Sequence, residues 1–219
     1  MKIKTLNKIL LVVIATSLSY GGFAQKIRLN AYAHYVFNDN IESYYSSTNY
    51  FNGTVNGGLL WGAGLEFRIN EGYGVELMYL RQDTKAPIQY YDFGNGVKNT
   101  EYDVALNYLM VGGARALHLD EKVEPYGGIM LGAAFIDTKN PETQSKQSAT
   151  KFAWGARLGA NIWATDAVGI KLQAQFIATV NAAGGSVYFG TGGSGTAVTA
   201  YSSMQQFSLG GGLVFRFGH

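Results

Sequence analysis

Side chains of alternating polarity recur along most of the chain, and this period of two constrains the fold more than any other feature of the sequence. Within residues 26–37, for example, Ile27 and Leu29 alternate with Arg28 and Asn30. Successive side chains of a β-strand point to opposite faces, whereas a helix would scatter these two sets around its axis. Eight such segments are recognisable, at 26–37, 59–69, 73–79, 102–115, 123–135, 152–162, 168–176 and 207–217. The chain is therefore predicted to be all-β, with about eight antiparallel strands.

The N-terminal segment has the layout of an export signal. Three lysines among the first eight residues precede an apolar run at 9–18, and small residues lead up to Ala24. About ten apolar residues are too few to cross a bilayer as a helix, which needs about twenty, and this layout is typical of a secretory signal peptide. We expect 1–24 to be a signal peptide and 25–219 to be the mature barrel domain. The alternative is an uncleaved helix.

Charge and cysteine content narrow the classes of function. Without the signal peptide, the 17 Lys and Arg residues fall by three to 14, against 15 Asp and Glu residues. A nearly neutral chain lacks the basic surface of a nucleic-acid-binding protein, so nucleic acid is not expected as a partner. The chain has no cysteine, which excludes disulfides and thiolate metal sites. No linker-like segment divides the mature chain, and a single domain is expected.

Two architectures produce this alternation: a soluble barrel or sandwich with its apolar face inside, and a membrane barrel with its apolar face outside. The polar face here is rich in glycine and carries both signs of charge, which suits a narrow lumen better than a solvated surface. Aromatic residues of the apolar face gather near strand ends, as in the interfacial girdles of membrane barrels. The predicted girdles are Tyr35, Phe37, Trp61, Tyr79, Tyr102, Phe135, Phe152, Trp154, Phe176 and Phe207 at one rim, and Phe67, Tyr73, Phe215 and Phe217 at the other.

The connections between the segments alternate in length. Those at 70–72, 117–123 and 164–167 are short, whereas those after the first, third, fifth and seventh segments are long and polar. Short periplasmic turns and long extracellular loops alternate in this way in outer-membrane barrels, which places both termini in the periplasm. Asn95-Gly96 is a hairpin signal and indicates that the third and fourth strands continue beyond the membrane. A ten-stranded barrel is the alternative.

Three segments combine this alternation with a particular placement of glycine and aromatic residues: LNYLMVGGARAL at 106–117, VEPYGGIMLGAAF at 123–135 and SLGGGLVFRF at 208–217. Together with the signal peptide, they resemble the bacterial outer-membrane β-barrel domain family of small OmpA- and OmpX-like barrels. The resemblance covers the mature chain and implies a single transmembrane β-barrel in the outer membrane of a Gram-negative bacterium, surrounded by lipid. It also implies recognition of the last strand by the barrel-assembly machinery. Phe217 stands in for the terminal aromatic residue, although Gly218 and His219 follow it.

Charged residues on the polar face form the candidate site. The predicted lumen charges are Arg28, Glu66, Arg68, Glu76, Asp103, Arg115, Arg157, Lys171 and Arg216. Asp103 and Arg115 belong to this set because the fourth segment is read with Tyr102 on the lipid face. An eight-stranded barrel is just wide enough for side chains to fill it, and buried charges need partners. We therefore expect the glutamates to pair with Arg157 and Lys171 in a plug; the alternative is a charged path through a narrow pore.

No group of residues has the pattern of a catalytic or metal site. Of the three histidines, His34 faces the lumen, His118 lies in a predicted turn and His219 is the last residue. A zinc site needs about three protein ligands, and a hydrolytic site needs a nucleophile beside a base. We therefore expect no enzymatic activity, metal or cofactor. A lipid-modifying enzyme would require His34 beside a serine and an acid at the outer rim.

The first external connection has the composition of a binding loop. It contains Tyr44, Tyr45, Tyr50 and Phe51 among serine, asparagine and glycine residues. Tyrosine supplies contact area and small polar residues supply hydrogen bonds in adaptable binding surfaces, so an extracellular protein or glycan is a candidate partner; an unspecialised loop is the alternative. The leading prediction is a non-enzymatic barrel serving envelope integrity or surface interaction. A small-solute or ion pore ranks second, and a lipid-modifying enzyme third.

Overall fold

The computed structural model describes residues 27–46, 49–70, 72–92, 96–117, 122–141, 144–180, 187–189, 198–200 and 204–217. The predicted signal peptide, His118 and His219 lie outside these residues. In the described part of the chain, no helix has the length and apolar character needed to span a membrane.

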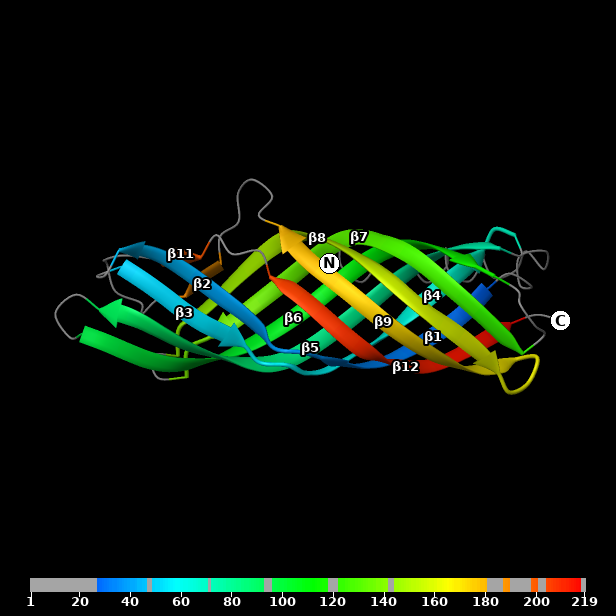
Figure 1. Cartoon of the computed structure of the whole chain (residues 1–219), viewed down its shortest axis with the longest axis horizontal. Coiled ribbons are helices and arrows are strands. Elements are labelled where there is room, and N and C mark those ends of the chain that lie inside the picture. Colours follow the sequence, from blue (N-terminus) through cyan, green and yellow to red (C-terminus); the bar gives the residue numbers. More distant parts are fainter. Residues whose placement is uncertain are drawn as a thin grey trace, which may run out of the picture.

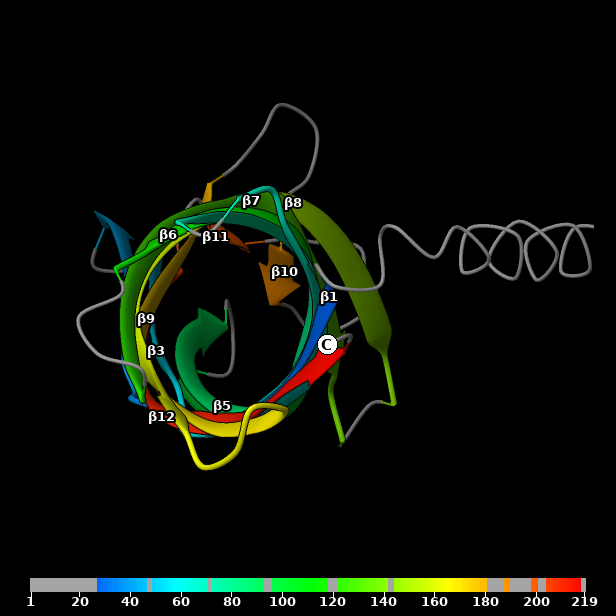
Figure 2. The same cartoon turned by 90° about the vertical axis from the view of Figure 1, so that its right-hand side faces the viewer.

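Eight antiparallel strands close into a barrel. They are β1 (Ile27–Val36), β4 (Gly58–Arg68), β5 (Tyr73–Asp92), β6 (Gly96–Ala116), β7 (Val123–Lys139), β8 (Lys146–Trp163), β9 (Val168–Val180) and β12 (Gln205–Phe217). Each pairs with its neighbour, and β1 pairs with both β4 and β12, which closes the ring seen end-on in Figure 2. Closure removes the unpaired strand edges that hydrocarbon would not tolerate. The predicted all-β barrel of about eight strands is confirmed.

Four shorter strands lie outside the ring. The first external connection forms a hairpin of β2 (Asp39–Ser46) and β3 (Asn49–Val55), and β3 pairs briefly with β5 where Gly53 meets Ile88. The connection between β9 and β12 contains the separate pair β10 (Val187–Phe189) and β11 (Val198–Ala200). Because neither pair enters the ring, the described strands do not support the ten-stranded alternative.

The two ends of the barrel differ. At the periplasmic end, Asn70 Oδ1 accepts hydrogen bonds from the backbone N–H groups of Gly72 and Tyr73, both at 2.9 Å, and Thr165 Oγ1 accepts one from Val168 at 3.0 Å. These side-chain caps are why such short turns suffice. At the other end β5 and β6, 20 and 21 residues long, run past the other six strands of the ring and lie alongside β2 and β3 (Figure 1). About ten residues cross a bilayer, so the predicted extension of this hairpin beyond the membrane is observed.

The outer face carries apolar side chains along the middle of the barrel. Leu29, Leu65, Leu77, Val111 and Leu172 are all exposed, whereas the residues that alternate with them point inward. Aromatic side chains border this band, and the rings of Phe37 and Phe207 stack on neighbouring strands. Most of the predicted girdle residues lie on this face.

The prediction for strand β6 was wrong about which face its residues occupy. Tyr102, assigned to the outer girdle, is 3% exposed inside the barrel, and Asp103 and Arg115, assigned to the lumen, are exposed on the outside. Asp103 lies above the lipid band, in register with Lys85 and Lys139, where the outer face meets water. Arg115 lies at the periplasmic end with its guanidinium over the ring of Tyr73, at 5.5 Å from the centroid. Such an amphipathic side chain reaches the headgroup region without entering the lumen.

Candidate functional site in the barrel interior

The periplasmic half of the lumen is held by ion pairs centred on Glu124. Arg28 donates to both oxygens of this carboxylate, at 2.6 and 2.9 Å, in the bidentate geometry that strengthens such a pair. Arg68 and Asn161 donate to Glu124 Oε1 at 3.3 and 3.0 Å. Glu66 lies beside them, with Oε1 3.6 Å from Arg28 Nη1. Residues from β1, β4, β7 and β8 are thus tied together across the lumen.

Sequence reasoning missed Glu124 because the faces of 123–135 could not be assigned. Glycine, alanine and apolar residues occupy both faces of that segment, so alternation alone carries little information. In the structure Glu124 and Tyr126 point inward, and Val123 points outward. The useful signal was Glu124 itself, because a carboxylate just inside a strand of a membrane barrel belongs on the lumen face.

A second pair lies further into the lumen and joins opposite walls. Arg157 Nη1 of β8 donates to Glu76 Oε2 of β5 at 2.5 Å, and both side chains are almost fully buried. Glu76 Oε1 also accepts hydrogen bonds from Tyr32 Oη at 2.5 Å and from Asn30 Nδ2 at 2.7 Å. One of the expected pairings, between Glu76 and Arg157, is therefore present in the structure.

Lys171 is placed differently from the expectation. Its ammonium nitrogen lies 4.4 Å from the ring centroid of Tyr126 and 5.8 Å from that of Tyr32, rather than against a carboxylate. Glu66 pairs instead with Arg28 and Arg68. The structure therefore brings together six of the nine predicted lumen charges, together with Glu124. These are Arg28, Glu66, Arg68, Glu76, Arg157 and Lys171.

Arg216 lies at the periplasmic mouth of the lumen. Its guanidinium stacks on the indole of Trp163 at 3.9 Å from the centroid, and Arg28 approaches the same ring at 4.9 Å. The remaining predicted lumen charges, Asp103 and Arg115, are the two that lie outside the barrel.

Glycines on the inner face make room for these large side chains. A Cβ atom at Gly64 would lie 2.0 Å from Glu76 Oε1, and one at Gly159 would lie 2.6 Å from Tyr126 Oη. Any larger residue at either position would displace a lumen hydrogen-bonding group. The high glycine content of the polar face thus follows from the narrow diameter of an eight-stranded barrel.

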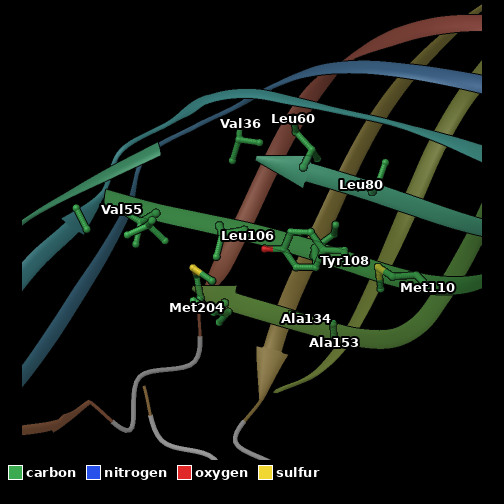
Figure 3. Packing of buried hydrophobic residues seen from close by; sticks show 14 of the residues in the cluster. Val36, Val55, Leu60, Leu80, Leu106, Tyr108, Met110, Ala134, Ala153 and Met204 are labelled. Atoms are coloured by element: carbon green, nitrogen blue, oxygen red, sulfur yellow. The ribbon is translucent and has the colours of Figure 1, made fainter. Parts of the chain in front are cut away.

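Above the ion pairs, an apolar layer closes the lumen. It comprises Leu60, Leu80, Leu106, Tyr108, Met110 and Met130, each at most 1% exposed. Figure 3 shows Leu60, Leu80, Leu106, Tyr108 and Met110 packed between the walls, with Val36 and Met204 next to them. Such a layer excludes water, because apolar side chains fill the cross-section at near-crystalline density.

A polar stripe runs up one wall beside the apolar layer. Tyr126 Oη donates to Gln173 Oε1 at 2.6 Å, and Gln173 Nε2 donates to Gln175 Oε1 at 2.9 Å. Nearer the outside, Tyr108 Oη donates to Gln206 Oε1 at 2.7 Å. These bonds satisfy polar groups that would be costly to bury unpaired.

The extracellular end contains a cavity of about 820 Å³ next to the extended strands. Its lining includes the inward-facing row of Thr84, Val104, Thr138 and Gln147, one residue from each of β5 to β8. The aromatic residues predicted to make contacts belong to the first external hairpin: Tyr44 and Tyr45 lie in β2, and Tyr50 and Phe51 lie in β3. In this hairpin Tyr44 is paired with Tyr50, and the register shifts between Tyr44 and Ser46.

Of the three histidines considered for catalysis, His34 lies within the described residues. His34 is 1% exposed in the lumen, and neither ring nitrogen has a hydrogen-bond partner. Across the described residues, no group of three or more His, Cys, Asp or Glu side chains is placed to hold a metal ion.

Comparison with known proteins identifies the fold. A scan against protein-family models gives no match. No curated protein matches the sequence. Among solved structures, Neisserial surface protein A is 15% identical with a TM-score of 0.54, over 87% of this chain and 97% of that one. OprG from Pseudomonas aeruginosa is 10% identical with a TM-score of 0.54, over 90% and 97%.

The same fold also includes an enzyme. The outer membrane protease OmpT from Escherichia coli is 9% identical with a TM-score of 0.52, over 89% of this chain and 97% of that chain. Similarity at this level of identity concerns architecture, and architecture does not determine activity. The chain therefore has the fold of the small outer-membrane β-barrels represented by these structures, with eight strands in its ring.

Proposed function

We propose that this protein is a closed, non-enzymatic barrel that anchors a rigid extracellular β-sheet, through which it contacts a protein or glycan outside the cell. The extension of β5 and β6 carries this proposal. Each strand is about twice as long as the bilayer requires, and the β2–β3 hairpin adds to the projecting sheet through β5. A sheet stiffened by backbone hydrogen bonds holds a binding surface in place better than a flexible loop does.

The filled lumen supports an anchoring role over a transport role. A solute would have to displace both the Glu76–Arg157 pair and the apolar layer above it. Breaking a buried ion pair and hydrating an apolar constriction are both costly. His34 is enclosed by the lumen, away from lipid, which supports a non-enzymatic protein over a lipid-modifying one.

Two further partners follow from the outer surface. The exposed apolar band is suited to outer-membrane lipid. Phe217 ends β12 with its side chain exposed, and we propose that the barrel-assembly machinery reads this terminal strand.

The proposal is tested on cells that display the protein. Residues 40–54 are replaced by a short Gly-Ser linker, and adhesion to other cells and to immobilised glycans is compared with the parent. We expect the variant to lose adhesion while it keeps the parent's heat-modifiable migration on gels, which reports an intact barrel. Unchanged adhesion would contradict the role of the hairpin. A large, steady conductance of the parent in planar bilayers would instead favour the pore.

A further inference from the structure

We propose that the lumen binds a small monovalent anion of the halide class beside Lys171, between the ion pairs and the apolar layer. This site lies in the interior of the barrel and is independent of any extracellular partner.

The charges of the lumen do not balance. On the periplasmic side of the apolar layer, the interior and its mouth contain Arg28, Arg68, Arg157, Lys171 and Arg216, but the carboxylates facing them are Glu66, Glu76 and Glu124. Five cations thus face three acids in this part of the lumen, an excess of two positive charges; Lys151, a further buried cation, lies higher on β8, in register with Ala134. Arg216 is partly exposed and stacks on Trp163 at the mouth, where water and ions reach it. The buried member of the excess is Lys171.

Lys171 lacks a counter-ion although it is 2% exposed. Within the described part of the chain, no carboxylate oxygen lies within 4.0 Å of its ammonium nitrogen, and its contacts are the faces of two tyrosine rings. The nearby carboxylate of Glu76 is already engaged by Arg157, Tyr32 and Asn30. Ring faces offset only part of the cost of burying an ammonium ion, so a further acceptor is required.

Unused hydrogen-bond donors on the same wall define where that acceptor would lie. His34 carries an imidazole with no partner at either nitrogen, and Gln175 Nε2 also has none. Both side chains are at most 2% exposed. Gly210 of β12 lies in register between His34 of β1 and Gln173 of β9, and the His34 ring lies over this glycine, with Cδ2 2.7 Å from the place of an added Cβ atom.

His34 shares its surroundings with Lys171, and Gln175 lies next to Ser208 on the same wall. The rings of Tyr32 and His34 lie 5.6 Å apart, and Lys171 faces the same Tyr32 ring. An ammonium group, an imidazole N–H and an amide NH₂ are all donors, and together they match an anion that accepts from several sides. The confined lumen favours a small one, and the cationic mouth would draw anions in.

Bromide is the probe, because it is of the halide class and scatters anomalously. Crystals of the detergent-purified barrel grown in sodium bromide should show an anomalous peak within hydrogen-bonding distance of Lys171 Nζ. In parallel, the Tm of the parent should rise by a few degrees, and saturably, as bromide replaces gluconate at constant ionic strength. Lys171→Met should lose both the peak and the Tm response.

Matched variants keep the test decisive. Lys85→Met removes an exposed lysine outside the lumen and should respond to bromide as the parent does. Gln175→Leu should reduce the rise of Tm in bromide while keeping the charge of Lys171. This variant replaces Lys171→Met in the test if Lys171→Met fails to assemble. The proposal is overturned if the parent has the same Tm in bromide and gluconate, or if bromide peaks appear only on the outer surface. A response that persists in Lys171→Met would also overturn it.

Discussion

Strand β6 passes through two regions whose outer faces differ in polarity. Within the lipid band, Leu109 and Val111 point outward. Beyond the band, Asp103 points outward while Tyr102 and Val104 are buried inside. The backbone alternates without interruption from one region to the other. What differs is the medium outside, which changes from hydrocarbon to water, so the outer face becomes charged, while the inner face is apolar in both regions.

The interior shows a related difference between its two halves. The periplasmic half is bound by ion pairs to Glu124 and Glu76, whereas the half toward the extracellular end packs apolar side chains around Leu106 and Tyr108. Buried ion pairs are lost abruptly when one partner is removed, whereas apolar packing loses stability in proportion to the volume removed. Substitutions in these regions should therefore change stability by different amounts, from the largest at Glu76 to the smallest at Lys85.

Removing the charge of Glu76 should have the largest effect. Glu76→Gln leaves Arg157 buried without a counter-charge, so we expect the free energy of unfolding to fall by about 3–5 kcal/mol. Denaturant titration of the barrel folded into lipid vesicles measures this free energy of unfolding. The matched control is Glu101→Gln, which breaks an exposed pair with Lys85 at 2.9 Å and should cost far less. Equal losses would show that water screens the interior pair.

Truncation of the apolar layer should come next. Leu106→Ala leaves a cavity at a position with 0% exposure, and we expect a loss of about 3 kcal/mol in the same titration. Leu109→Ala, on the lipid face of the same strand, is the control, because lipid chains can fill the space that the side chain leaves. If both variants lose the same stability, the lumen at this height is loosely packed.

A charge on the outer face should distinguish the lipid band from the extension. Val111→Arg places a cation in hydrocarbon and should cost about 2–4 kcal/mol. Ala105→Arg places the same side chain on the same face of β6, in register with Asp83 and Asp137 above the band. We expect this variant to fold as stably as the parent. A similar penalty at both positions would place residue 105 inside the lipid band.

The exposed pair on the extension should have the smallest effect and should depend on pH. The hydrogen bond that Lys85 donates to the Glu101 carboxylate raises the pKa of Lys85 above its ordinary value near 10.5. A raised pKa stabilises the folded state below the ordinary value, and this contribution disappears as the pH rises through the folded-state pKa. Lys85→Met should therefore have a slightly lower Tm than the parent at neutral pH, and the same Tm at strongly alkaline pH. High salt should also remove the difference.

The strand pattern determined the barrel because alternation is a local property. The faces of β1, with Arg28 and Asn30 inside and Leu29 outside, could be read from neighbouring residues alone, since this strand lies between lipid and a polar lumen. The pairing of Glu76 with Arg157 could also be anticipated, because a narrow barrel must bring buried charges together.

Two other features required the tertiary structure. Tyr102, Asp103 and Arg115 lie on the faces opposite to those predicted, because apolar residues occupy both faces of 104–111, where lipid lies outside and the apolar layer lies inside. Glu124 was missed because both faces of its strand carry small or apolar residues. Which acid meets which base depends on strand tilt and register around the closed ring, which bring Arg28 to Glu124, 96 residues away in sequence. Local alternation thus fixes which way a side chain points, whereas its partner and its solvent depend on how the whole sheet closes and how far it projects from the membrane.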